Sequence, residues 1–175
     1  MTNHDKHSKL IESIKGKEQI KILFVCLGNI CRSPAAEGVM KDIVEKNGDS
    51  EKFYIDSAGT GGWHVGELPD KRMRVHAFQR GYNLTHHCRQ VRTSDFEDFD
   101  IIVAMDENNR RNLQRMAPTA EDEKKIVMMA DFADPSLHYD HIPDPYYEGS
   151  EGFELVLDLL ESACHNLYRD LRAIE

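Results

Sequence analysis

Residues 20–34 read Ile-Lys-Ile-Leu-Phe-Val-Cys-Leu-Gly-Asn-Ile-Cys-Arg-Ser-Pro, an apolar run that leads through a short loop into a helix start. The β-branched and aromatic run at 20–25 is typical of a strand that is buried on both faces of a parallel sheet. Ser33 is suited to cap the following helix, and Pro34 fits its first turn. The stretch therefore predicts a strand, a loop, and a helix that continues to about residue 46.

The loop 26–33 has the features of an anion-binding site with a thiol at its base. In such a loop the backbone N–H groups and the positive end of the helix dipole converge, and a tetrahedral anion is favoured there. Cys26 and Arg32 lie at the two ends of the loop, and a guanidinium group pairs with two phosphate oxygens at once. A helix N-terminus, amide donors and a cation also favour the thiolate form, so Cys26 is a candidate nucleophile. Gly28 and Asn29 tolerate backbone conformations that most residues avoid.

Length and composition predict one cytoplasmic domain. The 175 residues are 40% hydrophobic and 30% charged, which is typical of a soluble globular protein. No apolar stretch approaches the ~18 residues of a membrane span. Residues 1–19 are polar and lack the apolar segment of a signal peptide, so we expect a flexible or marginally helical extension of a domain at 20–175. The net charge of −9 argues against a nucleic-acid-binding protein.

The four cysteines favour a reducing compartment. A domain of this size does not need disulfides, and no paired Cys-x-x-Cys spacing of a zinc site is present. His86, His87 and Cys88 lie together but lack a second cluster of ligands, so no metal site is predicted.

Strand and helix patterns alternate along the rest of the chain. Further strands are predicted at 53–58, 99–104 and 126–129. Helices are predicted from Pro69 to about 80, from Asp106 to about 116, and at 153–171, with a charged loop at 118–125. The last helix is amphipathic and has Cys164 on its apolar face. This alternation predicts an α/β fold in which helices cover a four-stranded parallel sheet.

Two loops that follow strands carry candidate site residues. In an open parallel sheet such loops gather around one crevice, on the side where Cys26 lies. A Gly-rich loop after the second strand contains Trp63, the only tryptophan, which is suited to face an aromatic leaving group. Asp144 lies between two prolines and precedes Tyr146 and Tyr147, and a carboxylic acid partly shielded by two tyrosines would keep a proton for a leaving oxygen. Taken alone, either stretch also fits an ordinary turn.

Together these segments resemble the low-molecular-weight protein tyrosine phosphatases. The resemblance covers about residues 20–172 and rests on segments that occur in the family's order and approximate spacing: 25–34 with Ala36-Glu37, Asp56-Ser57-Ala58-Gly59-Thr60, Arg89-Gln90-Val91, Met105-Asp106-Glu107 and Asp144-Pro145-Tyr146-Tyr147. We therefore expect a three-layer fold with helices on both faces of the sheet and the flavodoxin-like strand order 2-1-3-4.

The resemblance implies that the protein hydrolyses phosphotyrosine, an aryl phosphate monoester, without a metal or another cofactor. The Cys26 thiolate would attack the phosphorus and form a cysteinyl-phosphate, while the loop amides and Arg32 hold the equatorial oxygens. Asp144 would protonate the departing phenolate, and would then act as the base for the attacking water.

The resemblance also implies roles for neighbouring residues. Ser33 would hydrogen-bond the Cys26 thiolate, and Cys31 would trap an oxidised Cys26 as a reversible disulfide. The network that fixes the phosphate loop would consist of Asn29, Ser57, His86 and Glu37. The walls of the pocket would be Leu27, Ile30, Trp63, Tyr146 and Tyr147.

Three alternatives stay open. An arsenate reductase of related fold needs a pair of further cysteines on one mobile segment, whereas Cys88 has no nearby partner and Cys164 lies on a packed helix. A phosphoarginine phosphatase tends to have a smaller, polar residue in place of the apolar Ile30. A non-catalytic phosphotyrosine-binding module would not need a nucleophile, an arginine and an acid together.

The expected partner is a tyrosine-phosphorylated protein, with an autophosphorylated tyrosine kinase as one candidate. Inorganic phosphate or another oxyanion is expected to bind in the active site. Neither nucleic acid nor a membrane is an expected partner, and the sequence fits either a monomer or a weak dimer.

Overall fold

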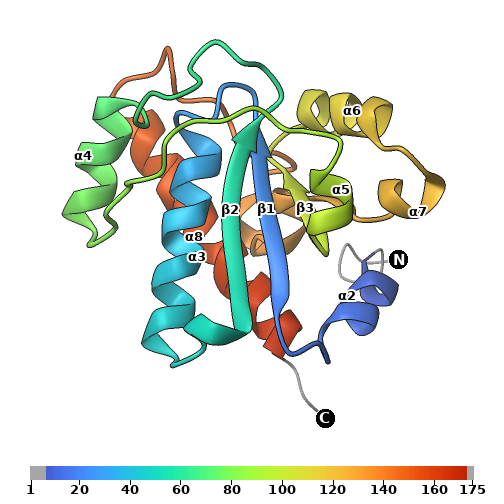
Figure 1. Cartoon of the computed structure of the whole chain (residues 1–175). Helices are drawn as coiled ribbons and strands as arrows, with labels where there is room; N and C mark the ends of the chain where they lie inside the picture. Colours follow the sequence, from blue (N-terminus) through green and yellow to red (C-terminus); the bar gives the residue numbers. More distant parts are fainter. Residues whose placement is uncertain (1–6, 173–175) are drawn as a thin grey trace.

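A four-stranded parallel sheet in the order β2-β1-β3-β4 lies at the centre of the computed structural model, which describes residues 7–172 (Figure 1). The strands are β1 (Ile20–Cys26), β2 (Phe53–Gly59), β3 (Ile101–Ala104) and β4 (Ile126–Met128). The strand order and the parallel pairing are confirmed as predicted. β3 begins at Ile101 rather than at residue 99, and every other strand boundary lies within one residue of its predicted position.

β1 is the strand on which the sheet is built. It pairs with β2 along its whole length, from Ile20 opposite Phe53 to Cys26 opposite Gly59, and with β3 on its other side. The side chains from Ile22 to Val25 are completely buried, as expected for a parallel strand that is covered on both faces. Because β1 is held on both sides, Cys26 has a fixed place at the carboxyl edge of the sheet.

Helices cover both faces of the sheet (Figure 1). On one face lie α3 (Arg32–Lys46), α4 (Lys71–Gln79) and α8 (Ser150–Arg172), and on the other lie α5 (Asp95–Asp98) and α6 (Glu107–Met116). Alternate side chains of β1 enter the two cores: Ile22 and Phe24 pack on the first face, and Leu23 and Val25 on the second. The short 3-10 helices Ser50–Lys52, Met129–Phe132 and Pro135–Leu137 lie in the connections.

α8 is the long amphipathic helix that the apolar periodicity predicted, although it begins at Ser150 rather than at residue 153. Its predicted apolar face is buried, and Cys164 is a core residue. The hydrophobic face packs mainly against α3 on the same side of the sheet.

Three local predictions are wrong, each for a different reason. α3 begins at Arg32 and its N-cap is Cys31, because the Ser33 hydroxyl is used inside the loop. α4 begins at Lys71 rather than at Pro69, because the side chain of Asp70 accepts hydrogen bonds from the first free N–H groups of the helix. The predicted loop 118–125 contains one helical turn, α7 (Ala120–Glu123).

The described part of the N-terminal stretch contains the helix α2 (Ser8–Ile14). Ile11 and Ile14 are buried in the same core as α3 and α8, and the His7 ring lies 2.7 Å from a carboxylate oxygen of Asp131. Residues 1–6 of the predicted extension lie outside the described residues. None of the described helices is both long enough and apolar enough to cross a membrane.

We expect Leu160→Ala to lower the free energy of unfolding by about 2–5 kcal/mol, because this side chain is fully buried and its removal leaves a cavity in the main core. Urea unfolding followed by circular dichroism measures the change. Leu137→Ala is the control: its side chain is exposed, so the change should stay within about 0.5 kcal/mol. Equal losses in both variants would contradict this view of the core.

Candidate active site

The predicted phosphate loop lies at the carboxyl edge of the sheet, between the end of β1 and the start of α3. Cys26 ends the strand and Arg32 begins the helix, and each is only 3% exposed. The intervening residues 27–31 form a tight loop, so the thiol and the guanidinium group are brought to one place at the positive end of the helix dipole.

The end of β2 supports this loop. Gly59 lies so close to it that an added Cβ atom would stand 2.7 Å from the carbonyl oxygen of Leu27 and 3.0 Å from the amide nitrogen of Asn29. Only glycine fits this position without displacing the loop backbone. Thr60 N–H donates to the carbonyl oxygen of Cys26 at 2.9 Å, and Gly61 N–H to that of Leu27 at 2.8 Å.

The side chain of Asn29 is the internal brace of the loop. Its backbone has a φ of 58°, a left-handed conformation that asparagine tolerates better than most residues. Its Nδ2 donates to Ser33 Oγ at 2.8 Å and to Ser57 Oγ at 3.0 Å. Its Oδ1 accepts from His86 Nε2 at 3.0 Å and from the backbone N–H of Arg89 at 2.9 Å. The completely buried amide thus uses all its hydrogen-bonding capacity to hold the loop.

Ser33 Oγ lies 3.0 Å from Cys26 Sγ and 3.3 Å from the carbonyl oxygen of Ala58. Because Asn29 Nδ2 donates to the serine oxygen, the hydroxyl proton is directed to one of these two acceptors. A hydroxyl donor at this distance stabilises an anionic sulfur.

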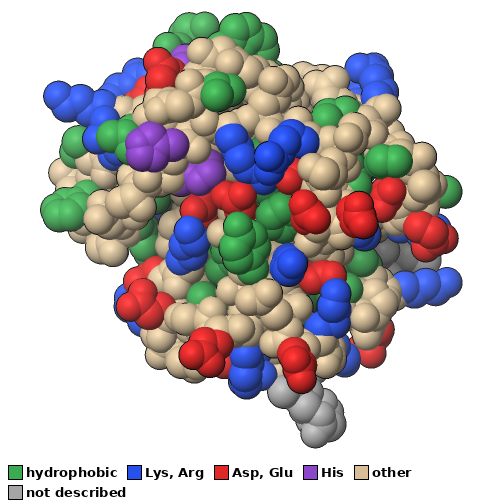
Figure 2. Space-filling view, viewed as in Figure 1, with side chains coloured by type: hydrophobic (Ala, Val, Ile, Leu, Met, Phe, Trp, Pro, Cys, Tyr) green, Lys and Arg blue, Asp and Glu red, His purple; other side chains and the backbone are tan. Residues whose placement is uncertain are grey.

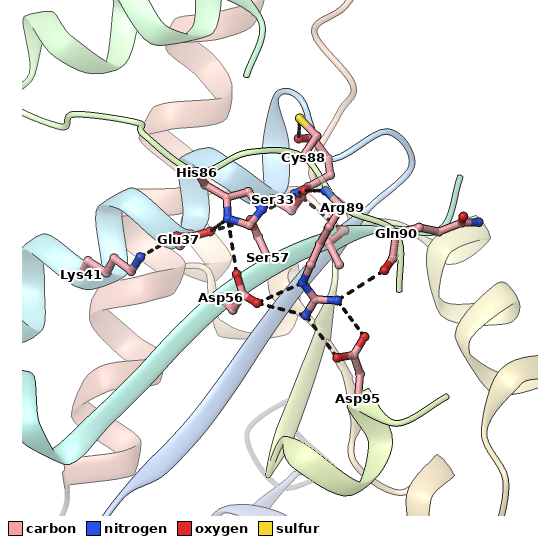
Figure 3. Close-up of polar contacts among 12 residues, drawn as sticks. Ser33, Glu37, Lys41, Asp56, Ser57, His86, Cys88, Arg89, Gln90 and Asp95 are labelled. Carbon is pink, nitrogen blue, oxygen red and sulfur yellow. Dashed lines mark hydrogen bonds and ion pairs between the residues drawn. The ribbon is translucent and has the colours of Figure 1, made fainter. Parts of the chain in front are cut away.

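Polar side chains behind the loop form a second layer (Figure 3). Ser57 O–H donates to Glu37 Oε1 at 2.6 Å, and His86 Nδ1 lies 3.4 Å from Glu37 Oε1 and 3.4 Å from Asp56 Oδ1. Lys41 pairs with Glu37 at 2.6 Å. This layer connects the brace of the phosphate loop to α3 and β2.

Arg89 joins the same layer to α5. Its guanidinium group contacts Asp56 at 3.0 Å and Asp95 at 3.0 Å (Figure 3). Burial lowers the pKa of Arg89, but the hydrogen bond to Asp95 and the charges of both carboxylates outweigh it and raise the pKa.

Glu37, Asp56 and His86 are the only described residues whose spacing suits a metal ion. The ligand atoms lie within 4.8 Å of one another. Both carboxylates already pair with cations, Lys41 and Arg89, so the arrangement is that of an ion-pair network. His87 and Cys88, which adjoin His86 in the sequence, do not belong to this group.

Arg32 is held from behind by groups that follow β3 and β4. Its Nη1 donates to Asp106 Oδ2 at 2.7 Å and to the carbonyl oxygen of Ile142 at 3.0 Å, and its Nη2 lies 3.7 Å from Asp144 Oδ2. Burial lowers the pKa of Arg32, but Cys26, Asp106 and Asp144 outweigh that effect and raise it. From the sequence, Asp106 was identified only as a helix cap. The segment Met105-Asp106-Glu107, which resembles the family, was the only sequence signal of its contact with Arg32.

Asp144 lies at the rim of the site, in the same pocket as Tyr146 and Tyr147, and its carboxylate is partly exposed to solvent. The Asp144 side chain is 45% exposed and Tyr147 is 93% exposed. Asp144 Oδ1 accepts from the backbone N–H of Tyr146 at 3.0 Å, a local turn that directs the carboxylate toward Arg32. The two tyrosine rings pack edge-to-face on each other, and Arg72 lies over the ring of Tyr146.

A pocket of about 240 Å³ opens between the loop, the Gly-rich segment and the tyrosines. Its lining consists of Leu27, Gly28, Ile30, Cys31, Trp63, His64, Asp144, Tyr146 and Tyr147. All five predicted wall residues are therefore brought together. His64 was missed, although it follows the tryptophan that sequence reasoning singled out, and its ring lies against Gly28 and 2.5 Å from a Glu67 oxygen.

The other three thiols have environments that keep them protonated. Burial raises the pKa of Cys31 and of Cys164, and it raises the pKa of Cys88 to about 11. The Cys88 thiol donates to the carbonyl oxygen of Asn29 at 2.7 Å, a further support of the loop that sequence reasoning did not find.

The fold, and the anion-binding loop with a thiol at one end and an arginine at the other, are those of a phosphatase. Comparisons with known proteins agree. The family model described as low molecular weight phosphotyrosine protein phosphatase matches residues 21–174. A member from Schizosaccharomyces pombe is 46% identical over 137 residues, 78% of this chain and 86% of that protein.

Solved structures are also similar to this chain. A protein tyrosine phosphatase from Entamoeba histolytica has 47% identity and a TM-score of 0.83, over 86% of this chain and 95% of that one. A Drosophila arginine phosphatase has 33% identity and a TM-score of 0.81, over 89% of this chain and 100% of that one. The chain belongs to the low molecular weight phosphotyrosine protein phosphatase family. By homology it is a protein-tyrosine phosphatase.

We expect Asp106→Asn to lower kcat/KM for an aryl phosphate by about 10- to 100-fold, because the buried Arg32 loses a charged acceptor. Asparagine caps helices as well as aspartate does, so α6 should stay intact and the thermal midpoint should change little. Steady-state kinetics and thermal unfolding measure the two effects. Unchanged kinetics would show that Arg32 does not depend on this carboxylate.

Proposed function

We propose that this enzyme hydrolyses phosphotyrosine through a cysteinyl-phosphate intermediate, with Cys26 as nucleophile and Asp144 as general acid and base. One observation carries the proposal. The buried thiol of Cys26 and the fixed guanidinium group of Arg32 occupy the two ends of a single anion-binding loop, and the Asp144 carboxylate lies 3.7 Å from that guanidinium group.

In the first step the Cys26 thiolate forms a bond to phosphorus as the bond from phosphorus to the aryl oxygen breaks. The loop N–H groups and Arg32 hold the three equatorial oxygens, on which charge gathers in the transition state. Asp144 transfers its proton to the aryl oxygen, so tyrosine leaves as a neutral phenol. The rim position of Asp144 suits this role, because the leaving oxygen points out of the loop.

In the second step water attacks the phosphorus of the cysteinyl-phosphate. Asp144, now a carboxylate, accepts a proton from the water, and the bond between sulfur and phosphorus breaks. Cys26 leaves as a thiolate, which the Ser33 hydroxyl stabilises from 3.0 Å, and inorganic phosphate is released.

The pocket lining favours an aryl substrate. Ile30, Trp63 and Tyr146 supply apolar walls for a phenyl ring above the phosphate loop. The similarity to an arginine phosphatase makes phosphoarginine the alternative substrate, and the apolar Ile30 favours phosphotyrosine over that charged group.

The natural substrate is then a tyrosine-phosphorylated protein, of which an autophosphorylated tyrosine kinase is one candidate. Inorganic phosphate is the product and, like other oxyanions, a competitive ligand of the same loop. Capture of an oxidised Cys26 by Cys31 stays a prediction, supported by their positions five residues apart in one loop.

We expect Cys26→Ser to lower the hydrolysis of phosphotyrosine by at least ~10³-fold, because a serine hydroxyl is not ionised here and no covalent intermediate forms. Inorganic phosphate release measures the rate. Cys164→Ala is the matched control, since it removes a thiol from the core and leaves the site untouched. A serine variant as active as the wild type would overturn the proposed mechanism.

We expect Asp144→Asn to slow turnover by about 10²–10⁴-fold for substrates with poor leaving groups, because asparagine supplies no proton to the departing oxygen. The loss should be much smaller for p-nitrophenyl phosphate, whose phenolate leaves without protonation. A series of aryl phosphates of graded phenol pKa measures the difference as a steeper dependence on the leaving group. Equal losses across the series would count against Asp144 as the acid.

A further inference from the structure

A second hollow lies beside the active site, along the exposed face of α4. It has a volume of about 710 Å³, and we call it the α4 groove, formed chiefly by Leu68, Lys71, Arg74, Val75, Phe78 and His87. Phe78 is 69% exposed, and Leu68 and Val75 are also exposed. Three exposed apolar side chains in one hollow form a patch of the kind that binds other molecules.

The charged side chains of the α4 groove are all basic. Among the described residues, Lys71 and His87 have no hydrogen bond or ion pair from their side chains, and Arg74 uses only its Nε, on the carbonyl oxygen of Pro69. No aspartate or glutamate lines the groove, although the chain has a net charge of −9. On the side of the molecule where α4 lies, Figure 2 shows hydrophobic and basic side chains close together at the surface.

Other arginines of the same region are neutralised. Arg72 pairs with Asp70 at 2.9 Å, and Arg80, just beyond the end of α4, pairs with Glu154 and Glu161 at 2.7 Å each. In this region Lys71 and Arg74 lack a carboxylate partner among the described residues, and both lie on the face of α4 that forms the groove. A carboxylate-bearing ligand would complement them.

A backbone hydrogen bond and a short chain segment link the α4 groove to the phosphate pocket. The backbone N–H of Asp70, the residue before Lys71, donates at 2.8 Å to the carbonyl oxygen of Ile30, which lines the pocket. Leu68 of the groove follows His64 of the pocket by four positions in the sequence. The two residues are therefore at most ~14 Å apart. A peptide with its phosphotyrosine in the pocket needs only about four extended residues to enter the groove.

We propose that the α4 groove binds a segment of the phosphorylated substrate protein, rich in acidic and apolar residues and starting about four residues from the phosphotyrosine. The apolar side chains of that segment cover Val75 and Phe78, and its carboxylates pair with Lys71 and Arg74. This inference rests on the proposed function for the placement of the phosphotyrosine. The groove would then select among substrate sequences, although it does not touch the reacting atoms.

Two phosphotyrosine peptides test the α4 groove. One carries Asp, Glu, Leu and Phe from the fourth residue onward, and in the other these residues are replaced by Ser. We expect the wild type to have a higher kcat/KM for the first peptide, and this preference to fall by about 3- to 10-fold in Lys71→Glu and in Phe78→Ser. Turnover of p-nitrophenyl phosphate should be unchanged in both variants, since neither residue lines the pocket.

Lys9→Glu is the matched control for charge, because Lys9 is exposed on α2 and lies outside both the pocket and the groove; its peptide preference should equal that of the wild type. Equal kcat/KM of the wild type for the two peptides would overturn the proposal. A second outcome would also overturn it. If Lys71→Glu and Phe78→Ser disrupt dimerisation in sedimentation experiments but keep the wild-type peptide preference, the groove binds a second copy of the chain.

A binding assay separates failure of this proposal from failure of the proposed function. Fluorescence anisotropy measures binding of the unphosphorylated acidic peptide to the Cys26→Ser variant, which does not depend on catalysis. We expect weak, salt-sensitive binding that is reduced when Lys71→Glu is added. Binding that is insensitive to Lys71→Glu would overturn the groove proposal even if hydrolysis proceeds as proposed.

Discussion

The buried amide of Asn29 is the interaction on which the site depends. A loop that aims its N–H groups at one anion must adopt a backbone that few residues accept, and Asn29 both adopts the left-handed conformation and ties it to four neighbours. These partners come from the loop itself, from β2 and from residues 86–89, so the loop is braced both from within and by two distant segments. Such preorganisation lets the donors stabilise transition-state charge with little rearrangement.

Charges around the loop are arranged in two groups with different tasks. Behind the loop, His86, Glu37 and Asp56 join with Lys41 and Arg89 in a network that supports Asn29 (Figure 3). In front of it, Asp106 and Asp144 flank Arg32. In the first group Glu37, Asp56 and His86 are largely buried and give rigidity, whereas Asp144 stands at the rim, where it reaches both a leaving group and water.

Much of the fold could be predicted from local patterns. The apolar runs located all four strands, and the periodicity of α8 correctly placed Cys164 in the core. The error at the start of α3 concerns a side chain with two available partners. Ser33 has the chemistry of a helix cap, but its hydroxyl contacts the Cys26 sulfur instead, and the N-cap is Cys31, two residues earlier. A cap preference is worth only ~1 kcal/mol, so a tertiary hydrogen bond network readily overrides it.

The candidate site also has one part that could be predicted from local patterns and another part that could not. The sequence by itself determined the strand, the anion-binding loop and the two ends at which Cys26 and Arg32 stand, because these depend on neighbours along the chain. Only the tertiary structure decided that Asp106 holds Arg32, that Asp144 stands at the rim near the same guanidinium group, and that the unpaired cations of α4 lie near the pocket. Arg32 and its two carboxylate partners come from segments more than seventy positions apart, and no local pattern encodes such a pairing.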